Sequence, residues 1–133
     1  MDGVDGVVAD LDGTVWVGMY PSGRGLGLQQ LVQGAWKPFA TPELDGSTLK
    51  VEKLFLDREN ALWVGTLKQG VYRIRDRKVD HFQSVDGLSS DTVYEFYEDT
   101  EGNLWIATAK GIDCFRDVRV ATSRLERDSA RMR

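Results

Sequence analysis

The chain has 133 residues, of which 41 % are hydrophobic and 29 % are charged, and its formal net charge is −4 with a pI near 5.0. This length suits one domain, and the composition is ordinary for a soluble globular protein. The acidic balance provides no basic surface for a polyanion, which argues against nucleic acid as a partner. No apolar run approaches the length that spans a membrane.

From its beginning, the chain carries a pattern that occurs three times. An Asp lies six residues before a Trp in Asp10 to Trp16, in Asp57 to Trp63 and in Asp99 to Trp105. The Trp residues are 47 and 42 residues apart. At such a period four short strands form one repeating unit, as in the blades of a β-propeller.

The third copy divides most clearly into strands. Residues 93–98 are rich in aromatic and β-branched residues, and residues 99–102 form a turn. We predict further strands over residues 104–108 and 112–116, and a fourth over residues 118–123. The other two copies divide in the same way.

The repeated Asp and Trp residues are interpreted as structural. The fourth position of each turn is Gly13, Asn60 or Gly102, and these residue types adopt positive φ at the lowest cost. The Asp that opens the turn can accept a bond from the backbone N–H two residues on. Each Trp is expected to be a buried wedge between neighbouring units, and a stacking platform for a sugar or base is the alternative.

The connections between the second and third strands are expected to carry specificity. The connection over residues 19–27 is longer and richer in Gly than its counterparts over 67–70 and 109–111, and individuality in a repeat array marks a binding face. In a propeller these connections share one face with the linkers between blades. The candidate ligand or partner contacts are therefore Tyr20, Arg24, Lys68, Ser90 and Lys110.

Other chemistry is disfavoured by the residues present. The run Asp10-Leu-Asp12-Gly-Thr resembles the first motif of haloacid-dehalogenase-like phosphatases, but it aligns with the two other repeats and the alternation of strands and helices is missing. His81 is the only histidine and Cys114 is the only cysteine of the chain. One histidine without a second or a nearby cysteine makes no metal site, and one cysteine makes no intramolecular disulfide. We expect no metal, no cofactor and no catalytic residues.

Nearly the whole chain resembles the two-component regulator propeller repeat, strongly in the second and third copies and more loosely in the first. The signature of this repeat is Asp, two residues, and Gly-Asn-Leu-Trp-Ile-Gly-Thr. This sequence matches it over Asp99 and residues 102–108, with Ala107 in place of Gly, and residues 87–91 resemble the Gly-Leu linker of the family. The resemblance implies a β-propeller from the sensor region of a hybrid two-component protein, often concerned with carbohydrate sensing outside the cytoplasm.

The predicted fold is therefore all-β, with three four-stranded antiparallel blades. The blades are expected over about residues 4–44, 51–84 and 93–125, so that the propeller unit covers residues 1–125 and a charged tail covers residues 126–133. Three blades cannot close a ring, since closed propellers have roughly 4 to 8. We expect a homo-oligomer, with a dimer of six blades favoured, or missing blades on another chain.

The function predicted is a non-enzymatic ligand-sensing or protein-interaction module, with a saccharide or another small molecule as a candidate ligand. One alternative is a propeller-type enzyme, a lyase or a glycan-processing protein, with its site at the central channel. The other is a purely structural assembly piece. The resemblance suggests the periplasm, although the acidic start lacks the basic-then-apolar layout of a signal peptide. The sequence leaves the localisation open.

Overall fold

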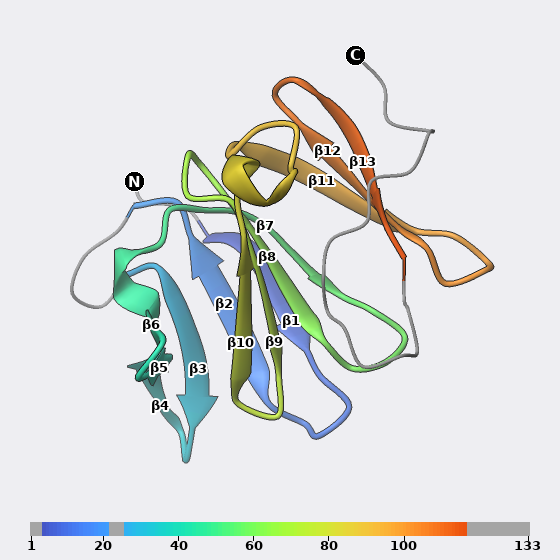
Figure 1. Cartoon of the computed structure of the whole chain (residues 1–133). Helices are drawn as coiled ribbons and strands as arrows, with labels where there is room; N and C mark the ends of the chain where they lie inside the picture. Colours follow the sequence, from blue (N-terminus) through green and yellow to red (C-terminus); the bar gives the residue numbers. More distant parts are fainter. Residues whose placement is uncertain (1–3, 22–25, 117–133) are drawn as a thin grey trace.

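A computed structural model describes residues 4–21 and 26–116 of the chain (Figure 1). Its first four-stranded antiparallel sheet follows the order of the chain. The strands of this sheet are β1 (Val4–Ala9), β2 (Val15–Met19), β3 (Leu28–Val32) and β4 (Ala35–Pro38).

Two further sheets repeat this arrangement. The second contains β7 (Val51–Leu56), β8 (Leu62–Thr66), β9 (Val71–Arg75) and β10 (Lys78–Phe82). The third contains β11 (Val93–Glu98), β12 (Leu104–Thr108) and β13 (Gly111–Phe115). The fourth strand predicted for this sheet, over residues 118–123, lies outside the described residues.

A small hairpin and two short 3-10 helices lie between the sheets. β5 (Ala40–Thr41) pairs with β6 (Leu44–Asp45) across a turn that contains Pro42, and η1 (Gly46–Thr48) leads into the second sheet. Pro favours such turns because its φ is already near the required value. η2 (Ser84–Asp86) opens the linker to the third sheet. The sequence analysis did not predict the hairpin or the helices.

The turn between the first two strands of each sheet is built in the same way. In the second sheet, Asp57 Oδ1 accepts hydrogen bonds from the backbone N–H groups of Glu59 (2.8 Å) and Ala61 (3.0 Å). Asp57 Oδ2 accepts a 2.8 Å bond from the indole Nε1–H of Trp63. Asn60, at the fourth position, has a φ of 66°. One carboxylate therefore shapes the turn and also satisfies the polar atom of a buried Trp.

The first and third turns repeat these bonds. Asp10 Oδ2 accepts from Trp16 Nε1–H at 3.0 Å, and Asp99 Oδ2 accepts from Trp105 Nε1–H at 3.0 Å. The Oδ1 atoms again accept from the N–H groups two and four residues further on. The six-residue spacing in the sequence thus corresponds to a direct bond between the two repeated side chains.

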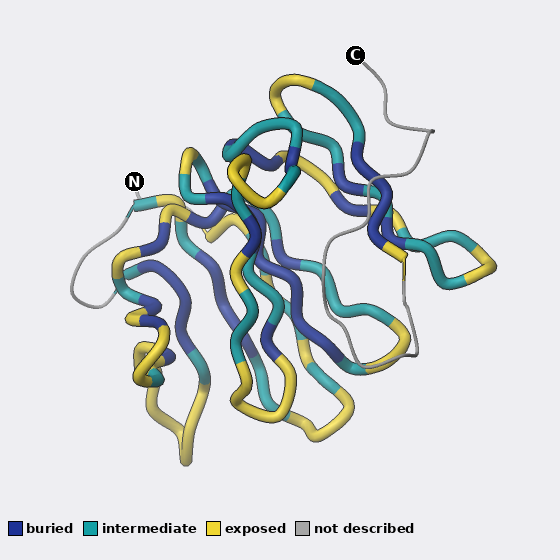
Figure 2. The backbone as a smooth tube through the Cα atoms, in the orientation of Figure 1, coloured by how far each residue is buried: buried dark blue, intermediate teal, exposed yellow. Residues whose placement is uncertain are grey.

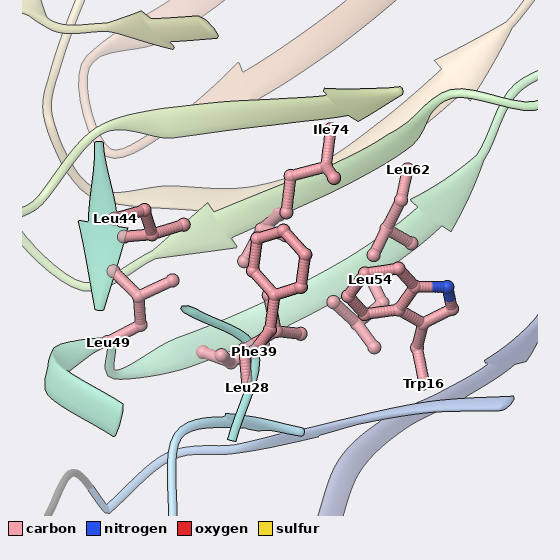
Figure 3. Close-up of a cluster of buried hydrophobic side chains, with 10 residues drawn as sticks. Trp16, Leu28, Phe39, Leu44, Leu49, Leu54, Leu62 and Ile74 are labelled. Carbon is pink, nitrogen blue, oxygen red and sulfur yellow. The ribbon is translucent and has the colours of Figure 1, made fainter. Parts of the chain in front are cut away.

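The sheets pack face to face and bury one apolar cluster at each of the two contacts. The first cluster places Trp16 against Phe39, with 5.1 Å between ring centroids, and against the side chains of β7 and β8 (Figure 3). The second places Trp63 between Phe96 and Phe115, with centroid distances of 6.3 and 5.0 Å. The central strand β8 is buried throughout, whereas β4 and the hairpin tips are exposed (Figure 2).

These observations confirm the predicted fold class. The described part of the chain is all-β, its complete sheets are four-stranded and antiparallel, and its only helices are two 3-10 turns. Among the described residues, no helix has the length and apolar character needed to cross a membrane. The predicted blade boundaries remain predictions.

Candidate functional site

One face of the molecule is formed by the β8–β9 turn, the β12–β13 turn and the linker that precedes β11. Lys68 N–H donates to Thr92 Oγ1 at 3.1 Å, and Gly70 N–H donates to the Asp91 carbonyl oxygen at 2.8 Å. Ala109 N–H donates to the Thr92 carbonyl oxygen at 3.0 Å. These bonds join three segments, far apart in sequence, into one surface that we call the loop face.

Gln69 extends the loop face toward the first sheet. Its side-chain Nε2–H donates to the Thr48 carbonyl oxygen and its Oε1 accepts from Lys50 N–H, both at 2.8 Å. Its own carbonyl oxygen lies 2.7 Å from His81 Nε2 on the outer strand β10. One Gln thus connects the linker before β7, the β8–β9 turn and the outer strand.

The predicted contact residues fall into three groups. Lys68, Ser90 and Lys110 lie on the three segments that the hydrogen bonds bring together, and the backbone N–H of Lys110 donates to Thr108 Oγ1 at 3.1 Å. Tyr20 is exposed and follows β2, at the corresponding end of the first sheet. Arg24 lies outside the described residues. Their role as ligand contacts stays a prediction.

A second set of residues lies where the first strands of the sheets begin. In β1, β7 and β11 the pairing with the next strand shifts after the first residue, so that Asp5, Glu52 and Tyr94 each form a β-bulge. β7 contacts both β1 and β11. The three bulges therefore occupy the same register position on neighbouring inner strands, at the end of each strand that meets the loop face (Figure 1).

The bulges carry polar groups, and the pKa of one of them, the Glu52 carboxyl, is shifted. Partial burial raises the pKa of the Glu52 carboxyl, and the negative charge of Asp5 raises it further. The next residue, Lys53, forms a 3.4 Å ion pair with Glu95 on β11. Tyr94, which precedes Glu95 in sequence, presents an exposed phenol. Carboxylates, an ammonium group and an aromatic ring suit a polar organic ligand.

The sequence contained a signal for these bulges that the sequence analysis missed. In a regular strand, residues on one face recur every second position, yet the apolar residues here are three apart: Val4 and Val7, Val51 and Leu54, and Val93 and Phe96. An extra residue between them restores the register. The same irregular spacing in three aligned strands predicts a bulge in each.

The repeated Asp residues have their oxygens engaged within the fold. Asp10 and Asp12 belong to the run that resembles the phosphatase motif. Asp10 accepts bonds from its own turn and from Trp16, and Asp12 Oδ2 accepts from Asn60 Nδ2–H at 3.2 Å. In the third turn, the hydrogen bond from Trp105, followed by the bonds from the turn itself, lowers the pKa of Asp99 to about 2. No group of three or more metal-ligating side chains occurs within residues 4–21 and 26–116.

Three stacked antiparallel sheets, each joined to the next by a linker on the same face, define part of a β-propeller. Solved propeller structures match this arrangement. One is PorZ, a bacterial surface component of the type-IX secretion system of Porphyromonas gingivalis, with a TM-score of 0.66 and 18 % identity. The match covers 82 % of this chain and 17 % of that one.

Two other solved structures are similar. The extracellular domain of the hybrid two component system BT4673 from B. thetaiotaomicron matches with a TM-score of 0.64 and 17 % identity, over 85 % of this chain and 17 % of that one. Virginiamycin B lyase from Staphylococcus aureus, solved in an inactive form with quinupristin, matches with a TM-score of 0.62 and 16 % identity. That match covers 87 % of this chain and 39 % of the lyase. The chain thus spans less than half the length of each.

Residues 87–110 match the family described as two component regulator propeller. This segment runs from the linker through β11 and β12 and includes Asp99 and Trp105. The match confirms the resemblance found in the sequence, in the copy where the signature is most complete. No curated protein sequence matches the chain.

Proposed function

We propose that this chain is a non-enzymatic module that senses a small polar ligand at its loop face, with a saccharide as the favoured class and a second copy of the chain covering its open sides. The observation that carries the proposal is the joining of three distant segments into one hydrogen-bonded surface. Such bonds fix the backbone of the three segments before a ligand binds, and preorganisation of this kind favours affinity.

The groups on the loop face and at the adjoining bulges fit a saccharide in their chemistry. Asp5 and Glu52 can accept hydrogen bonds from sugar hydroxyls, Tyr94 can offer a ring face, and the rim carries Lys68 and Lys110. Sites that bind small molecules usually combine aromatic side chains with a small number of placed polar groups. The resemblance to sensor regions, and the extracellular two-component domain among the similar structures, support a sensing role.

Titration of the labelled chain with a panel of saccharides, monitored by two-dimensional NMR, tests the proposal. We expect shifts at residues of the loop face, and we expect the double variant Lys68→Ala and Lys110→Ala to weaken binding. Lys78→Ala is the matched control, because Lys78 is an exposed Lys at the opposite end of the second sheet. Shifts confined to other surfaces, or equal binding by the Lys68/Lys110 variant and the control, would overturn the proposal.

The second candidate is a propeller-type enzyme, and the raised pKa of Glu52 favours it. A carboxyl that retains its proton above its usual range can act as a general acid, and a structurally similar propeller is a lyase. The same NMR samples discriminate the two candidates. New product resonances that grow with time, and that Glu52→Gln abolishes, would favour the enzyme, whereas bound but unchanged saccharide favours the sensing module.

A further inference from the structure

Each sheet has two faces with distinct residues. We call the face that carries the repeated Trp the Trp face, and the other the reverse face. In the first cluster, the Trp face of the first sheet, with Trp16, packs on the reverse face of the second, with Leu54 and Ile74. In the second cluster, Trp63 packs on Phe96 and Phe115 of the third sheet. Every contact between sheets therefore joins a Trp face to a reverse face.

The reverse face of the first sheet has no neighbouring sheet among the described residues. Its residue Val7 aligns with Leu54 and Phe96, yet Val7 is 63 % exposed, whereas Leu54 and Phe96 are each 5 % exposed. Val4 and Leu31 are exposed in the same way, although their counterparts in the other sheets are buried. The sequence thus places core-type residues where the part of the chain that the structure describes provides no partner.

Within residues 4–21 and 26–116, no sheet packs on the Trp face of the third sheet either. Tyr97, which aligns with the inward-packed Phe55, is exposed, and Trp105 is only half-buried, whereas Trp16 and Trp63 are buried. Ala107 occupies the place of Gly18 and Gly65. A small residue at this place is what allows the next sheet to approach.

We infer that the Trp face of the third sheet packs on the reverse face of the first sheet of a second copy, in the register seen at both internal contacts. This inference rests on the proposed function, in which a second copy covers the open sides. Two copies supply six sheets, within the roughly 4 to 8 that close a propeller, and a head-to-tail contact of this kind closes when the rotation completes a ring. In this arrangement Val7 of one copy lies against Tyr97 and Trp105 of the other.

The internal contacts give the register in atomic terms. A Cβ built on Gly18 lies 3.1 Å from the Cβ of Val51 on the neighbouring sheet, and a Cβ on Gly65 lies 2.9 Å from Cγ1 of Val93. Ala107 and Val4 hold the equivalent places at the new contact. A disulfide joins Cβ atoms roughly 3.5–4.5 Å apart, and the Cβ of Ala107, absent from Gly18 and Gly65, holds the two sheets slightly further apart than at the internal contacts. The pair Ala107→Cys and Val4→Cys is therefore predicted to form a bond between copies.

The experiment is oxidation of the full chain that carries both substitutions, followed by non-reducing electrophoresis, with light scattering of the unoxidised chain alongside. We expect a covalent dimer for this pair, and none for the single variants or for Ala107→Cys with Val85→Cys, since Val85 lies on η2, away from both faces. A dimer by light scattering without the cross-link would refute the register and leave the second copy standing. A monomer that binds saccharide would refute both the register and the second copy while the sensing role stands.

A charge placed on the reverse face provides an independent measurement. Val7→Asp would bury a carboxylate against Tyr97 of the other copy, so the dimer dissociation constant should rise at least about tenfold. Val85→Asp is the matched control, because Val85 is an even more exposed Val, and its dissociation constant should stay unchanged. Equal dissociation constants for the two variants would overturn the inference.

Discussion

The hydrogen bond between Asp57 and Trp63 permits a quantitative prediction. Asp57 accepts from three donors, the N–H groups of Glu59 and Ala61 and the indole Nε1–H, at 2.8, 3.0 and 2.8 Å. Asn has one acceptor oxygen and two donor hydrogens, so Asp57→Asn cannot serve all three donors. If the turn keeps its bonds, an amide N–H faces the indole N–H. Because Trp63 is buried, the indole donor is left without an acceptor, which costs about 1–3 kcal/mol.

Urea unfolding of wild type and Asp57→Asn at pH 7 measures this loss. We expect the free energy of unfolding to fall by about 2 kcal/mol, and Tm to fall by roughly 5–10 °C for a domain of this size. Asp99→Asn is the comparison, measured at a protein concentration at which the copies are separate. It should cost less because Trp105 is half-buried in the single chain and water can reach its indole. A loss below about 0.5 kcal/mol for Asp57→Asn, or a larger loss for Asp99→Asn, would refute the reasoning.

A double-mutant cycle identifies the indole as the cause. Trp63→Phe removes the donor and keeps an aromatic ring in the cluster, so Asp57→Asn should cost less in that background than in wild type. The difference isolates the interaction between the two side chains. If the losses in unfolding free energy of the two single variants add up to that of the double variant, the cost of Asp57→Asn comes from the turn bonds alone.

Three further predictions concern packing and pH. Gly18→Ala should lower the free energy of unfolding by about 1–3 kcal/mol, because its Cβ would lie 2.5 Å from Val51 Cγ1; urea unfolding measures it. Ionised Asp99 contributes stability that is complete above its ordinary pKa of 3.8 and is lost as the pH falls toward about 2. Asp99→Asn should therefore flatten the dependence of the urea midpoint on pH in that window. Glu52 has a raised pKa through burial and the charge of Asp5, so Glu52→Gln should stabilise the fold at pH 7, with the gain vanishing below pH 4.5.

Each of these predictions has a control within the chain. Gly6→Ala meets the flexible side chain of Leu54 at 3.3 Å rather than a branched Cγ1 at 2.5 Å, so it should cost less than Gly18→Ala. Glu43→Gln, at an exposed site, should leave stability at pH 7 unchanged where Glu52→Gln raises it. Reversal of either order would contradict the packing or the electrostatic argument.

The Asp-to-Trp spacing was sufficient to predict the sheets, because it marks a turn whose chemistry is local. Asp57 opens the turn, Asn60 adopts its positive φ, and Trp63 lies in the buried strand that follows, all within seven residues. The family match over residues 87–110 covers the copy in which this pattern is most regular. Local hydrogen bonds are the part of a fold that a short stretch of sequence specifies most directly.

Features that depend on distant partners were not predicted. The β5–β6 hairpin is held by bonds from Gly46 N–H to the Phe39 carbonyl oxygen and from Phe39 N–H to the Leu28 carbonyl oxygen, which join residues that no spacing rule connects. The bonds from the Gln69 side chain to the linker before β7 depend likewise on how the sheets stack. The positions of Lys68 and Lys110 on the rim were predicted from the repeat. The bulges of the inner strands were not, because their signal is the irregular three-residue spacing of apolar residues within the repeat.

The three bulges have a consequence for how such a protein can change over time. A bulged residue stands outside the alternation that commits its neighbours to one side of the sheet or the other, so its side chain is not part of the packing between sheets. Asp5, Glu52 and Tyr94 already differ in charge, size and aromaticity, while the residues around them keep the same places in three copies of one design. Evolution can therefore vary these positions independently and alter what the inner edge accepts, while the architecture that supports them is inherited intact.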